Sequence, residues 1–91
     1  MNFPPSVKIG AHDYVLKFIP YWEGADEELA NTHYESQTIT INSGLSETQK
    51  FCTFLHEAMH VMNHDIDHAL LDSLAEQIGQ TLLDNGFIRD T

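Results

Sequence analysis

The sequence predicts an α+β domain in which a small antiparallel sheet of three or four strands is followed by an antiparallel helical hairpin. Two observations support this fold class. The first half of the chain contains short runs of β-branched and aromatic residues separated by turn residues, a pattern typical of strands. After Asn42-Ser43-Gly44, apolar residues recur at helical spacing. No linker, repeat or low-complexity stretch interrupts the chain, so we expect a single domain over residues 1–91.

The first predicted hairpin lies near the start of the chain. Residues 7–10 alternate in polarity, and residues 14–19 are rich in β-branched and aromatic side chains. Gly10-Ala11-His12-Asp13 provides the turn between them, and Pro20 ends the second strand. Residues 23–30 then form an acidic connector, with room for one helical turn.

A second hairpin is expected around Ser36-Gln37, between strands at residues 32–35 and 38–42. In the latter strand Ile39 and Ile41 share one face, and polar residues occupy the other. We therefore expect a sheet with one buried face.

Two helices are expected in the second half. Ser46-Glu47-Thr48-Gln49 has the form of a capping box and predicts the start of the first helix. The second is expected from about residue 67 to residue 85, and Asp84-Asn85-Gly86 predicts where it stops. The predicted core face comprises Phe51, Leu55, Ala58 and Met62 in the first helix, and Leu71, Leu74, Ala75, Ile78 and Leu82 in the second.

The charge of the chain excludes several classes of partner. Four Lys and Arg residues against 14 Asp and Glu residues give a net charge of −10 at pH 7. Such a surface repels phosphate backbones and anionic lipids, so we expect no nucleic-acid and no membrane partner. Cys52 is the one cysteine, and the first residues have neither the basic region nor the apolar run of a secretory signal. We therefore expect a cytoplasmic protein.

The most informative motif is His56-Glu57-Ala58-Met59-His60. On a helix the two histidines stand one turn apart, so that both imidazoles can bind one ion. Zinc suits imidazole ligands and leaves a coordination position open for water. A glutamate directly after the first histidine can accept a proton from that water as general base. The motif thus predicts Zn²⁺ bound by His56 and His60, with Glu57 as the catalytic residue.

A catalytic zinc site needs a third protein ligand. His64 continues the row of histidines, but a straight helix spreads three successive imidazoles too far apart to converge. If the second helix packs antiparallel to the first, residues 71–76 lie opposite the motif. Asp72 and Glu76 are the acids in this window. Asp72 is closer to the seam between the helices and is predicted as the third ligand, with Glu76 as the alternative.

These features resemble a minimal zincin metallopeptidase of the gluzincin type, and in particular the short minigluzincins and the phage- or prophage-encoded peptidases of the ImmA/IrrE kind. The specific motif is His56-Glu57 with His60. The similarity also extends over the expected strands at 7–10 and 39–42 and over the helix that carries Asp72. In gluzincins the third ligand is a glutamate, and the matching position here holds the shorter Asp72.

The predicted function is therefore that of a zinc-dependent peptidase that hydrolyses peptide bonds with a metal-activated water. Its substrate is expected to be a peptide or protein. Because so short a chain has little room for subsite walls, we expect activity that is latent or directed at one protein partner. The alternative is an acidic, phage-type binding or inhibitor protein without catalytic activity.

Several other residues have two interpretations each. Tyr34 either stabilises an oxyanion or packs on the sheet, and His64 and His68 either line the cleft or are solvated turn residues. Cys52 is interpreted as a small buried hydrophobic residue. Trp22 is either a plug for the sheet or a rim of the cleft.

Overall fold

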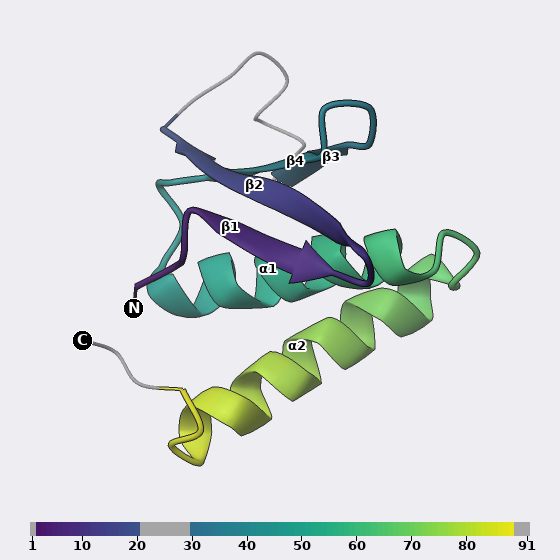
Figure 1. Cartoon of the computed structure of the whole chain (residues 1–91). Helices are drawn as coiled ribbons and strands as arrows, with labels where there is room; N and C mark the ends of the chain where they lie inside the picture. Colours follow the sequence, from purple (N-terminus) through teal and green to yellow (C-terminus); the bar gives the residue numbers. More distant parts are fainter. Residues whose placement is uncertain (1, 21–29, 89–91) are drawn as a thin grey trace.

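The computed structural model of the chain describes residues 2–20 and 30–88. Trp22 and residues 23–29 of the predicted connector 23–30 lie outside these residues, and the last connector residue, Ala30, begins a strand instead. The described elements are β1 (Ser6–Ile9), β2 (His12–Ile19), β3 (Ala30–His33), β4 (Thr38–Asn42), α1 (Glu47–Met62) and α2 (His68–Asp84). The α+β class, with strands first and two helices after them, is confirmed. Figure 1 shows that α1 lies against the sheet and that α2 lies on the other side of α1.

The sheet is mixed, and the prediction of a purely antiparallel sheet was wrong in this respect. Its strand order is β1-β2-β4-β3, and the two central strands, β2 and β4, run parallel. Both predicted hairpins exist: β1 pairs antiparallel with β2, and β3 pairs antiparallel with β4. The pattern along the sequence indicates which neighbouring strands form hairpins, but it contains no information on how two hairpins join.

The two turns explain where the strands end. Gly10 adopts a φ of 62° between Ile9 and His12, which glycine tolerates without steric cost. In the second hairpin the turn spans residues 34–37, where Gln37 adopts a φ of 50° and its N–H donates to the Tyr34 carbonyl. The third strand therefore lies at Ala30–His33, two residues before its predicted position.

The core lies between the sheet and α1. Ile39 and Ile41 are completely buried, as their shared face predicted. Leu16 pairs with Ile39 in the parallel register and is buried on the same face. Thr32 also pairs with Ile39, from the other side, so its side chain points toward α1. This register places a polar side chain at the border of the core, directly over the helix.

Helix α1 starts where the capping box predicts. The Ser46 hydroxyl accepts from the Gln49 N–H, and the Gln49 side chain accepts from the Ser46 N–H. Phe51 and Ala58 are buried, whereas Met62 is 68% exposed because it is the last residue of the helix. The predicted core face is therefore correct at Phe51 and Ala58 and wrong at Met62.

Helix α2 begins at Asp67, whose carboxylate accepts from the Leu70 N–H, and it stops before Gly86, which has a φ of 76°. Among the described elements it contacts α1 alone. Because α2 packs against one helix only, it buries a narrow apolar stripe, and Leu74 and Ile78 remain exposed. None of the helices in the described ranges has the length and apolar character needed to cross a membrane.

The two helices approach closely at Gly79. A Cβ atom there would lie 2.6 Å from the Cys52 Sγ. Alanine at position 79 gains about 1 kcal/mol in helix propensity but loses about 1–3 kcal/mol to overpacking. We therefore expect Gly79→Ala to lower the free energy of unfolding in the wild-type background and to raise it in a Cys52→Ala background, measured by urea denaturation. An equal loss in both backgrounds would contradict this packing.

Candidate active site

Helix α1 presents His56 and His60 on one face, one turn apart. Their ring centroids are 5.0 Å apart, and both side chains are half-buried. This is the arrangement that the sequence motif predicts for two ligands of one ion.

A third imidazole joins them from α2. His68, the first residue of that helix, has its ring centroid 5.6 Å from that of His56 and 4.7 Å from that of His60. One nitrogen from each of the three rings lies within 4.8 Å of the others. Within residues 2–20 and 30–88, this is the group of side chains that could hold a metal ion. Three imidazoles and an open side match the donor set of a catalytic zinc site.

Asp72 lies one turn after His68 and contacts His56. Its Oδ1 is 2.8 Å from the His56 Nδ1, and its side chain is 63% exposed. A carboxylate that accepts from Nδ1–H fixes the tautomer of the ring and leaves Nε2 as the metal-binding atom. The antiparallel packing predicted for the helices thus does bring Asp72 to the motif, although direct ligation by Asp72 stays a prediction. Glu76 lies outside the group of three imidazoles.

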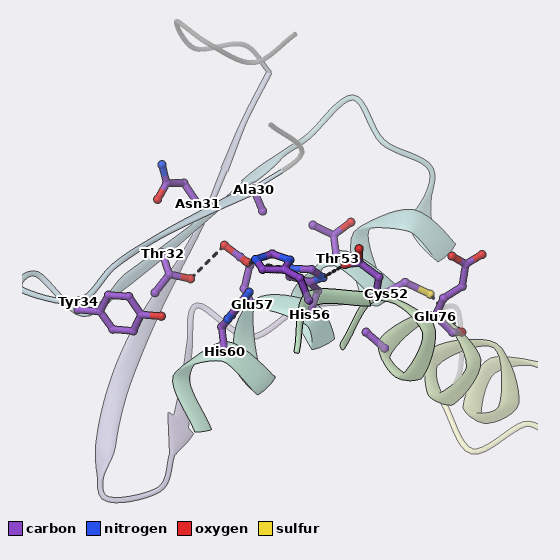
Figure 2. A pocket seen from close by; sticks show the side chains of 13 residues that line it. Ala30, Asn31, Thr32, Tyr34, Cys52, Thr53, His56, Glu57, His60 and Glu76 are labelled. Atoms are coloured by element: carbon purple, nitrogen blue, oxygen red, sulfur yellow. Dashed lines mark hydrogen bonds and ion pairs between the residues drawn. The ribbon is translucent and has the colours of Figure 1, made fainter. Parts of the chain in front are cut away.

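Glu57 is only 9% exposed, and its side chain extends from α1 toward the sheet. The Thr32 hydroxyl donates to Glu57 Oε1 at 3.1 Å, as Figure 2 shows. The second oxygen, Oε2, lies 3.9 Å from the His56 Nε2. One carboxylate oxygen is therefore anchored to β3, while the other faces the imidazoles. Thr32 could not be predicted from the sequence, because its role depends on the strand pairing that puts it over α1.

The surroundings of His60 favour a neutral, metal-binding imidazole, and those of Tyr34 favour a protonated phenol. Burial, with smaller contributions from His56 and His68, lowers the pKa of His60. Burial and the Glu57 carboxylate raise the pKa of Tyr34, so its hydroxyl remains a hydrogen-bond donor. His64 does not join the other histidines; its ring packs against Tyr34 with centroids 4.6 Å apart.

These side chains line a cavity of about 710 Å³ between the two helices and β3. Figure 2 shows Tyr34 at one end of it, with its hydroxyl directed toward the histidines, and Cys52 and Glu76 at the other end. The lining residues are Ala30, Asn31, Thr32, Tyr34, Cys52, Thr53, His56, Glu57, His60, His68, Asp72, Ala75 and Glu76. A volume of this size suits a bound peptide segment or a small molecule.

Comparison with known proteins identifies the family. The Peptidase M78 family, described as the IrrE N-terminal-like domain, matches residues 11–83, which is most of the chain. This match includes all the residues described above as candidate ligands and the candidate base. Neither a curated protein nor a solved structure matches the chain significantly. The resemblance to peptidases of the ImmA/IrrE kind is therefore confirmed: the chain is a metallopeptidase-like domain and belongs to the family of IrrE N-terminal-like domains.

Proposed function

We propose that the protein is a zinc-dependent peptidase that hydrolyses peptide bonds. The observation that carries this proposal is the convergence of three imidazole nitrogens within 4.8 Å, with the Glu57 carboxylate beside them. Membership of a peptidase family supports the same reaction class. In our proposal His56, His60 and His68 hold the ion, and Asp72 orients His56 through Nδ1. When bound, zinc supplies a Lewis acid that polarises a carbonyl and lowers the pKa of water.

Glu57 is the proposed general base and later the general acid. Its Oε2 accepts a proton from the attacking water, and the same carboxyl group then gives the proton to the leaving amine. The hydrogen bond from Thr32 holds Oε1, so the carboxylate does not rotate away between the two steps. Burial keeps bulk water from competing for the proton.

The substrate is proposed to be a peptide or protein segment that lies extended along β3. This strand is at the edge of the sheet, and Ala30, Asn31 and Thr32 line the cavity. An extended chain can add to such an edge through backbone hydrogen bonds. In our proposal the Tyr34 hydroxyl, which lines the cavity, donates a hydrogen bond to the developing oxyanion. We also propose a cytoplasmic location, where the thiol of Cys52 stays reduced.

We expect the purified protein to bind about one equivalent of zinc per chain, because a mononuclear catalytic site has this stoichiometry. Elemental analysis after dialysis should show nearly complete loss of zinc in His56→Ala and in His60→Ala. The exposed His12, on β2, gives a matched control as His12→Ala. Full zinc retention by either site variant would contradict the metal assignment.

The peptidase reaction is tested on the zinc-loaded protein with an unfolded protein or a long peptide library as substrate, because a shallow site binds short peptides weakly. Cleavage that disappears with a chelator and returns with zinc supports the proposal. Zinc-independent binding to a basic protein without any cleavage would instead support the inhibitor function.

A further inference from the structure

The cavity continues past the imidazoles, and this end of it, the compartment, is not used by the hydrolytic chemistry. Its lining includes Cys52, Thr53, Ala75 and Glu76, and Figure 2 shows Glu76 at this end. Glu76 follows Asp72 by one helical turn, about 6 Å along the axis, which equals about two residues of an extended peptide. A substrate that crosses the metal site therefore places a neighbouring side chain in this compartment.

The walls of the compartment are small side chains. The Cys52 thiol donates to the Glu76 carbonyl at 3.9 Å, which holds this side chain against α2. Ala75 is buried and adds only a methyl group. Such walls leave space for a long side chain and can pack along its apolar stem.

The charge in the compartment is negative. Glu76 is exposed to the cavity, and none of the described lining residues is Lys or Arg. Burial raises the pKa of the Cys52 thiol, and the nearby Glu76 carboxylate raises it further. The negative charge of Glu76 is therefore felt inside the compartment. The net charge of −10 also attracts a cationic segment over a longer distance.

We propose that Glu76 selects substrates that carry a lysine or arginine side chain one to three residues from the scissile bond. This inference rests on the proposed peptidase function and adds the substrate class. Glu76 is thus a specificity residue rather than a metal ligand. The stem of the basic side chain packs along Cys52 and Thr53, which are partly exposed in the cavity, and its cationic end reaches the Glu76 carboxylate.

Cleavage of matched peptides tests the proposal. Alanine-rich peptides carry lysine, norleucine or glutamate at successive positions, and the products are sequenced by mass spectrometry. With the zinc-loaded wild-type chain, we expect lysine at one fixed position to raise kcat/KM about threefold to fivefold over norleucine, which is what an ion pair with an exposed carboxylate supplies. Glu76→Gln should remove this preference, and Glu76→Lys should shift it toward glutamate. Asp84→Asn, an equal change of charge at an exposed position near the end of the same helix and outside the cavity, should keep it.

A binding measurement separates this inference from the peptidase reaction. Fluorescence polarisation with labelled, zinc-loaded Glu57→Gln protein, which keeps the metal but cleaves slowly, and the same peptides should show that lysine strengthens binding. Adding Asp84→Asn to this variant should keep the effect, and adding Glu76→Gln should remove it. If nothing is cleaved but this binding preference is present, the peptidase function fails and the basic-side-chain site stands. If peptides are cleaved or bound without a preference for lysine, or with a preference that survives Glu76→Gln, the inference is wrong and the peptidase function is unaffected.

Discussion

Replacing Glu57 by glutamine should reduce peptide hydrolysis by roughly 10²–10⁴-fold, the usual contribution of a general base. Glutamine keeps the shape of the side chain, and its carbonyl oxygen can still accept from the Thr32 hydroxyl. It cannot take up the proton of the attacking water. We therefore expect normal folding and normal zinc content together with a low kcat.

Three measurements on Glu57→Gln are needed: circular dichroism for the fold, elemental analysis for zinc, and steady-state kinetics on a long peptide. Glu35→Gln is a matched control, because Glu35 is an exposed acid in the turn after β3 and does not line the cavity. The control should retain full activity. Undiminished hydrolysis by Glu57→Gln would show that another group activates the water.

The second large effect concerns the third metal ligand. If His68 is a ligand and Asp72 orients His56, His68→Ala should lose more zinc affinity than Asp72→Ala. Loss of an orienting carboxylate typically lowers metal affinity by 10–100-fold, about 1.4–2.7 kcal/mol. Asp72→Asn keeps a carbonyl oxygen that can accept from the His56 Nδ1–H, so it should lose less affinity than Asp72→Ala.

Zinc affinity is measured by competition with a chromophoric chelator. His64→Ala is the matched control, because His64 packs on Tyr34 and lies outside the group of three imidazoles. The opposite order, with a large loss for Asp72→Ala and little for His68→Ala, would make Asp72 the third ligand, as the sequence predicts.

The parts of the fold that are decided by neighbouring residues could be predicted from the sequence. The capping box at Ser46 and the glycine at position 86 correctly indicated the start of α1 and the end of α2. The parallel pairing of β2 with β4 could not be predicted, because the alternation of residues along β4 does not indicate which strand from the first hairpin pairs with it. The exposure of Met62 likewise depends on where α1 ends rather than on the helical period.

In the candidate site, too, the residues on one helix could be predicted from the sequence, whereas those brought in by the tertiary structure could not. His56, Glu57 and His60 follow from one motif on one helix, and their proximity needs no knowledge of the tertiary structure. Thr32 and His68 come from β3 and from the start of α2, so their positions depend on strand register and on the length of the turn between the helices. The sequence correctly placed Asp72 near the seam between the helices, but it could not show which atom of His56 the carboxylate would contact.

The isolation of α2 from the sheet has a consequence for how the molecule opens. Since α2 contacts only α1 among the described elements, it can detach as a unit while the sheet and α1 stay folded. His68 and Asp72 belong to this detachable helix, whereas His56 and His60 belong to the stable part. An ion bound across the two helices would therefore slow hydrogen exchange in α2 much more than in β2 or β4, and its removal would uncouple the two parts.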